Sequence, residues 1–184
     1  LPTRRQRQMC IRDSLCVACL FEDEALLREQ LDLSDMFGAR TLVIITGGFE
    51  ALKSAGHDGD IDYARSLLVE RLALAAELAD SYRVRLAFEP LHPMVCGFRS
   101  IVSTLQESLD ILDQMDDSHD IGLAIDAYAL WWEHDLQEKL KRAGNRILNY
   151  HVSDWLADTR DLRLDRGMPG DGQIALCDWR HMIE

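Results

Sequence analysis

The sequence lacks two features that would assign it to large classes of protein. No apolar run approaches the roughly 20 residues of a transmembrane helix, so we do not expect the chain to cross a membrane. There is also no surplus of basic residues, because 20 lysines and arginines stand against 32 aspartates and glutamates, a net charge of −12. Since binding to a phosphate backbone needs a basic face, we do not expect nucleic acid as a partner.

Cysteines are few and irregularly spaced. Their number, five, is odd, which argues against a disulfide framework and is typical of a reducing cytoplasm. Cys16 and Cys19 form a CxxC pair, but no second pair follows and both lie in an apolar run. We therefore interpret them as packed thiols rather than zinc ligands or a redox pair, and we expect a cytoplasmic protein.

The first fourteen residues differ from the rest of the chain. They contain four arginines against a single aspartate and show neither helical nor strand periodicity. Their string resembles a translated sequencing adapter of the kind found at the ends of predicted metagenomic proteins. We expect residues 1–14 to be a non-native tail and residues 15–184 to be a single, incomplete domain. The alternative is a basic arm that binds an anionic partner.

Short apolar runs alternate with amphipathic segments along the remaining chain. The runs predict strands that are apolar on both faces, and the segments between them predict single helices. Strands separated by single helices indicate an α/β fold with a parallel sheet. Five strands do not close an eight-stranded barrel, so the alternatives are an open doubly wound sheet and an incomplete barrel. The strands are expected at residues 15–20, 41–46, 84–88, 121–125 and 146–150, and the helices at 22–37, 61–82, 103–115, 135–143 and 176–184.

Three of the predicted strands run directly into a side chain that can bind a divalent metal. These side chains are Glu89, Asp126 and His151. The carboxyl ends of parallel strands share one rim, where β/α barrels carry their active sites. Two carboxylates and an imidazole suit Mn²⁺, Mg²⁺ or a similar ion better than structural zinc. Each residue also has a structural interpretation: a salt bridge for Glu89, a helix cap for Asp126, and an ordinary hydrogen-bonded residue for His151.

Residues close to these strand ends are candidates for contacts with a substrate. Trp131 is interpreted either as a core residue or as part of a pocket wall. Asp154, three residues after His151, is placed to orient its ring or a water molecule. Arg166 lies in a glycine-rich segment, which is either a plain turn or a loop in which the arginine binds a substrate oxygen or phosphate.

Four motifs follow one another along the chain. They are Glu89-Pro-Leu-His-Pro-Met, Asp126-x-Tyr-x-x-Trp-Trp, His151-Val-x-Asp-Trp and Asp165-Arg-Gly-Met-x-Gly-Asp-Gly. Together, over residues 38–184, they resemble the sugar phosphate isomerases and epimerases of the xylose isomerase-like TIM-barrel superfamily, which includes AP endonuclease family 2-like proteins. The resemblance implies a partial (β/α)8 barrel with about five of its eight strands, lacking N- and C-terminal units.

The resemblance also implies a site. In this superfamily Glu, Asp, His and a last Glu hold a divalent metal, here Mn, Mg, Co or Zn, and Glu89, Asp126 and His151 match the first three. The fourth ligand is expected beyond residue 184. Glu89 would also transfer a proton, and Arg166 matches a substrate-binding arginine, with His92 of the first motif as a further substrate contact. The family often has a histidine that contacts substrate where this chain has Ala129.

The implied function is that of a metal-dependent sugar or sugar phosphate isomerase or epimerase, acting on a small sugar or polyol. We also consider that the longer protein, of which this chain would be a part, forms a homo-oligomer. Two alternatives stay open: an inosose-type dehydratase with the same ligands, and a truncated barrel without activity. An endonuclease of the same fold is disfavoured because it needs a histidine-rich, multi-zinc site, and only His151 of the six histidines matches a ligand position.

Overall fold

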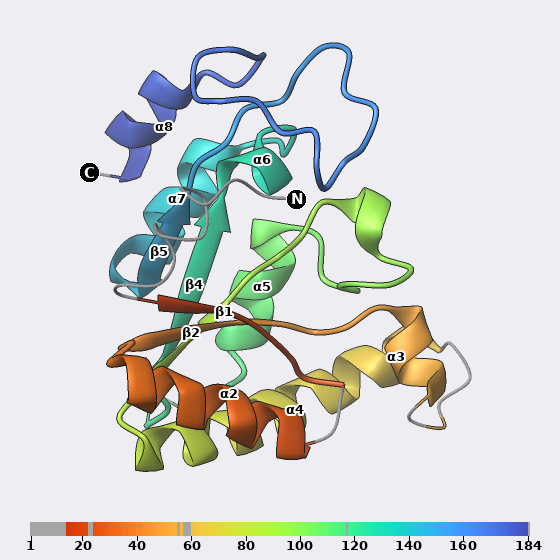
Figure 1. The fold of residues 1–184 in the computed structure, drawn as a ribbon, viewed down its shortest axis with the longest axis vertical. Coiled ribbons are helices and arrows are strands. Elements are labelled where there is room, and N and C mark those ends of the chain that lie inside the picture. Colours follow the sequence, from red (N-terminus) through yellow and green to blue (C-terminus); the bar gives the residue numbers. More distant parts are fainter. Residues whose placement is uncertain (1–13, 22–23, 55, 57–59, 117, 184) are drawn as a thin grey trace.

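The computed structural model describes residues 14–21, 24–54, 56, 60–116 and 118–183. Except for Ser14, which begins the first strand, the predicted tail lies outside these residues. Five parallel strands form one sheet in the order β1-β2-β3-β4-β5 (Figure 1). Strands that pair in sequence order build the wall of a barrel, whereas a doubly wound sheet reverses its order at a switch point. The predicted α/β fold is therefore confirmed, as an incomplete barrel.

The predicted strands are confirmed, with ends that differ by one residue at most. They are β1 (Ser14–Cys19), β2 (Thr41–Ile45), β3 (Arg85–Phe88), β4 (Ile121–Asp126) and β5 (Ile147–His151). The helices are α2 (Glu24–Phe37), α3 (Phe49–Ser54), α4 (Ile61–Ser81), α5 (Leu105–Leu112), α6 (Ala127–Leu130), α7 (Leu136–Ala143) and α8 (Leu176–Ile183). In the described part of the chain, every helix is too short or too polar to span a bilayer.

Side-chain caps fix where the central helices begin. Asp60 Oδ1 accepts hydrogen bonds from the backbone N–H groups of Asp62 and Tyr63 at 3.0 and 3.1 Å, so α4 starts at the next residue. Thr104 caps α5 in the same way. The prediction that α5 continues to Met115 was wrong, because the helix ends at Leu112. Met115 still packs against buried apolar residues on both sides of this helix, so the apolar periodicity continues past the last helical turn.

The core has an outer and an inner part. On the outer side, α2 and α4 pack against β1, β2 and β3, while α5, α7 and α8 form a second cluster beside β4 (Figure 1). The inner face of the sheet carries a separate small cluster of Val43, Ala87 and Ala124, all with no exposed surface, against which Leu148 packs. The inner face of β2, β3 and β4 is therefore lined by small side chains.

Gly122 allows β4 and β5 to approach closely, and Gly122→Ala is expected to destabilise the sheet. A Cβ at this position would meet the carbonyl oxygen of Arg146 and lie 2.9 Å from Leu148 Cδ1. Overpacking of this kind costs about 1–3 kcal/mol, which urea denaturation would measure as a lower free energy of unfolding. The control is Gly97→Ala, where an added Cβ meets nothing within 4 Å. Equal stability of the two variants would contradict this packing.

Candidate active site

The three strand-end residues predicted to bind a metal lie on one rim of the sheet. Side chains alternate along a strand, so Glu89 and Asp126 share a face with Ala87 and Ala124, two residues earlier. These alanines line the inner face, so both carboxylates point to the inside of the barrel wall. Asp126 pairs in register with His151 on the neighbouring strand. Glu89 and Asp126 are only 6% and 3% exposed, so both are buried carboxylates.

Each buried carboxylate has a partner within the protein. His151 Nδ1 lies 3.1 Å from Glu89 Oε1, a hydrogen bond in which Nδ1 is the donor when the carboxylate is ionised. Arg166 Nη1 donates to Asp126 Oδ2 at 2.9 Å. The other oxygen of Asp126 accepts from the backbone N–H of Tyr128 at 2.9 Å and so caps α6. Asp126 therefore both caps α6 and belongs to the candidate site.

The surroundings of Asp126 make its ionised form less favourable. Burial raises the pKa of Asp126 above its usual value, and the neighbouring Glu89 raises it further, although the Arg166 guanidinium opposes both effects. In the described residues, however, no three His, Cys, Asp or Glu side chains are already gathered as a metal site. Instead, Asp126 pairs with Arg166, and Glu89 pairs with His151. The donor set has the right chemistry for a divalent metal, but its members are paired with protein groups.

An aromatic wall flanks the carboxylates, and we define it as His92, Tyr128, Trp131, Trp132 and Trp155. Trp155 is its centre, with ring centroids 4.8 Å from Tyr128, 5.2 Å from His92 and 5.8 Å from Trp131. The sequence indicated His92 and Trp131 but missed the central role of Trp155, although it stands in the His151-Val-x-Asp-Trp motif. Arg166 Cζ lies 4.3 Å above the ring of Tyr128, so the wall also holds the arginine.

His92 is held as part of this wall in its neutral form. Its Nδ1 accepts a hydrogen bond from the backbone N–H of Met94 at 3.2 Å. Burial lowers the pKa of His92 below the usual value for histidine. A neutral ring whose Nδ1 accepts carries its proton on Nε2. His92 can therefore offer one hydrogen-bond donor to a ligand.

Asp154 organises the glycine-rich loop that carries Arg166. Its side chain has no exposed surface and accepts hydrogen bonds from the backbone N–H groups of Trp155, Gly170 and Ile174 at 2.9, 2.9 and 3.0 Å. Burial alone would raise the pKa of Asp154, but these backbone donors outweigh it and lower the pKa below its usual value. These contacts are with the loop and not with the His151 ring, so in this structure Asp154 positions the loop.

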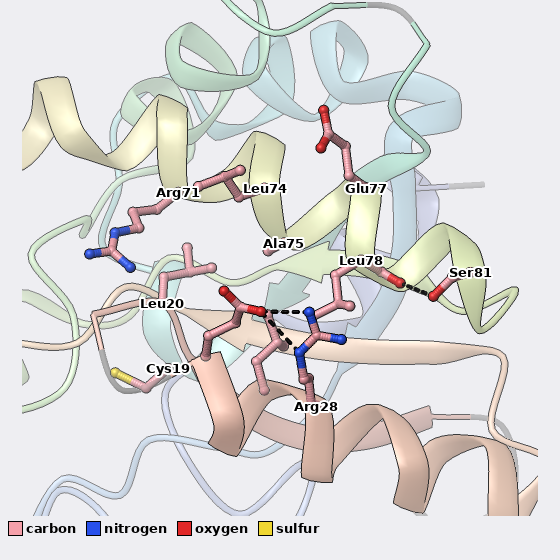
Figure 2. A pocket seen from close by; sticks show the side chains of 11 residues that line it. Cys19, Leu20, Arg28, Arg71, Leu74, Ala75, Glu77, Leu78 and Ser81 are labelled. Carbon is pink, nitrogen blue, oxygen red and sulfur yellow. Dashed lines mark hydrogen bonds and ion pairs between the residues drawn. The ribbon is translucent and has the colours of Figure 1, made fainter.

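A separate groove lies between α2 and α4, away from these residues (Figure 2). It has a volume of about 380 Å³ and is lined by Leu20, Leu78, Arg28 and Arg71, among others. Arg28 on this groove pairs with Glu24 at 2.6 Å. None of the predicted site residues borders it. Its position on the outer helices separates it from the strand-end carboxylates.

The family model for the xylose isomerase-like TIM barrel matches residues 23–184, so the chain belongs to this family. Protein SMc04130 from Sinorhizobium meliloti 1021 is 37% identical, with a TM-score of 0.77 over 92% of this chain and 63% of that one. The IOLI protein, solved with a zinc atom, is 20% identical, with a TM-score of 0.72 over 93% of this chain and 62% of that one. An L-ribulose 3-epimerase is 19% identical, with a TM-score of 0.68 over 92% of this chain and 56% of that one.

The two more distant structures share the fold with this chain. In all three comparisons, the chain spans less than two thirds of the other protein, consistent with the five strands observed. Among curated proteins, no sequence matches this chain.

Proposed function

We propose that this chain is part of a metal-dependent isomerase or epimerase that transfers a proton next to the carbonyl group of a sugar or polyol-derived substrate. The observation that carries the proposal is the pair of buried carboxylates, Glu89 and Asp126, beside His151 at adjacent strand ends. Two solved structures with this fold are named as sugar epimerases, for L-ribulose and for 3-keto-D-glucosides. Those names support the reaction class for a complete barrel.

Glu89, Asp126 and His151 would hold the metal in this proposal, with Mn, Mg, Co and Zn as candidates. Two carboxylates and one imidazole supply oxygen and nitrogen donors that these ions accept. The IOLI structure, which has this fold, contains a zinc atom. Asp126, whose pKa is raised, gains stability in its ionised form from any cation nearby. A divalent metal bound here would polarise the substrate carbonyl and acidify the adjacent carbon.

In this proposal one residue transfers the proton and the others bind or position the substrate. Glu89 moves the proton, and its Oε1 lies 3.1 Å from His151 Nδ1, which fixes the position of the carboxylate. Arg166 binds a substrate oxygen, because Asp126 and Tyr128 hold its guanidinium at the rim. Trp131 and His92 belong to the aromatic wall, which excludes water from the reacting carbon. Asp154 keeps the Arg166 loop in place.

Titration of Mn²⁺ into the chain by calorimetry tests the proposed metal site. We expect a dissociation constant in the micromolar range or tighter, about −8 kcal/mol of binding free energy. Asp126→Asn is expected to weaken binding at least about tenfold, because it removes a charged ligand. The matched control is Asp120→Asn, an exposed carboxylate paired with Arg85 at 2.7 Å. Equal Mn²⁺ affinity of the Asp126→Asn variant and the unchanged chain would exclude this site.

A further inference from the structure

Three arginines border one small cavity beside the proposed site. Arg99 comes from the loop after β3, and Arg163 and Arg166 come from the loop after β5. Leu91, Phe98, Tyr128 and Ala129 form the apolar part of the wall. Arg166 is shared with the strand-end carboxylates, because its Nη1 bonds Asp126. The cavity is thus a direct continuation of the candidate active site.

Two of these arginines form no direct ion pair with a carboxylate in the described part of the chain. Within the described residues, neither Arg99 nor Arg163 forms a side-chain ion pair, whereas Arg166 pairs only with Asp126. The chain carries 32 acidic residues against 20 basic ones, so carboxylates are abundant as partners. Two arginines without an ion-pair partner beside a third that has one are therefore unexpected in so acidic a chain. An arrangement of this kind is typical of a site where the counter-charge arrives with a ligand.

The arginines also repel one another. Burial lowers the pKa of Arg99, and the nearby positive charges of Arg163 and Arg166 lower it further, although Glu89 partly compensates. A partly buried charge is costly without a partner. An anion bound among the three guanidinium groups would remove both the repulsion and the unpaired charge.

The size of the cavity limits what it can hold. Its volume is about 40 Å³. A cavity needs roughly 10–15 Å³ to hold a single water, so this one has space for about three waters, or for one carboxylate or phosphate group. A sugar ring is larger than this. The rest of a ligand held here would extend past Arg166 towards Glu89 and Asp126.

We propose that Arg99, Arg163 and Arg166 form a subsite for one anionic group, a carboxylate or a phosphate, at one end of a hydroxy-carbonyl substrate. Guanidinium forks match the paired oxygens of both groups, and bonds to charged acceptors are the stronger ones. The position of the reacting end rests on the proposed function, but the anion subsite itself does not. Its consequence is that neutral sugars are poor substrates compared with sugar phosphates or sugar acids.

The first test measures anion binding by the chain itself, without metal or turnover. Inorganic phosphate and acetate are titrated by calorimetry at low ionic strength, and binding to the unchanged chain is expected for at least one of them. Arg99→Gln and, separately, Arg163→Gln are expected to weaken that binding at least about tenfold. The anion that binds more tightly identifies the group, phosphate or carboxylate.

The matched control is Arg71→Gln, which removes one positive charge from an arginine on the outer groove of Figure 2. Anion affinity is expected to stay within about twofold there. Circular dichroism and the unfolding midpoint establish that each variant is folded, and Arg163 is exposed, so its replacement tests the subsite if Arg99→Gln does not fold. The proposal is overturned if the unchanged chain binds neither anion, or if all three variants lose affinity equally.

A second test separates this subsite from the proposed reaction. In a complete barrel, phosphorylated or carboxylated sugars are compared with their neutral counterparts, and Arg163→Gln is expected to raise the KM of the anionic substrate without changing that of the neutral one. Anion binding in the first test together with no isomerisation would contradict the proposed function and leave the subsite standing. Equal KM changes for charged and neutral substrates would contradict the subsite.

Discussion

Glu89→Gln in a complete barrel is expected to lower turnover by roughly 10²–10⁴-fold, the usual contribution of a general acid or base. Glutamine has nearly the same shape, and its amide oxygen can still accept the 3.1 Å hydrogen bond from His151 Nδ1. The amide cannot take up a proton, so the chemistry is lost while the packing remains. The measurement is kcat, together with exchange of the substrate proton for deuterium followed by NMR.

The control for this variant is Glu107→Gln. Glu107 of α5 pairs with Arg65 of the outer helix α4 at 2.7 Å, so turnover is expected to stay within about twofold. The unfolding midpoint of Glu89→Gln should match that of the unchanged protein. Retained proton exchange in the Glu89→Gln variant would remove Glu89 as the proton-transfer residue, even if Mn²⁺ affinity fell.

The sheet could be predicted from the sequence because its determinants are local. Runs such as 121–125 are apolar on both faces and end at polar residues, which fixes a buried parallel strand without knowledge of its neighbours. The choice between a barrel wall and an open sheet depends on which strands pair, and no single run contains that information. The short helix α6 was also missed, since four residues carry too little periodicity to predict one.

The position of Glu89 and Asp126 on one face of the sheet could be predicted from the sequence, but the side chains that pair with them could not. Alternation along β3 and β4 is enough to place Glu89 and Asp126 on one face. Glu89 and His151 are 62 positions apart in the sequence, and Asp126 and Arg166 are 40 apart. Contacts between residues so far apart depend on the whole fold. Arg99 carries no motif at all. In the sequence it is simply an arginine in the loop after a strand, and nothing there distinguishes it from an ordinary surface arginine.

Glu133→Ala is expected to cause the largest loss of stability outside the hydrophobic core. The Glu133 side chain is only 3% exposed and bonds Lys139 Nζ at 2.8 Å. Its carboxylate also accepts the backbone N–H groups of Leu105 and Gln106 at 2.9 and 3.3 Å, the first residues of α5. It thus anchors the helix that follows the Arg99 loop.

Removing this carboxylate takes the ion-pair partner from the Lys139 ammonium, which keeps only its hydrogen bond to the His134 carbonyl among the contacts described here, and it takes the acceptor from two helix N–H groups. Breaking a buried ion pair costs about 3–5 kcal/mol, a large fraction of the 5–15 kcal/mol typical of a domain. The matched control is Glu138→Ala on α7, whose side chain is 73% exposed and also pairs with a lysine at 2.8 Å, so about 1 kcal/mol or less is expected. Urea denaturation gives both values. If Glu133→Ala cost no more than Glu138→Ala, the anchoring of α5 by this carboxylate would be disproved.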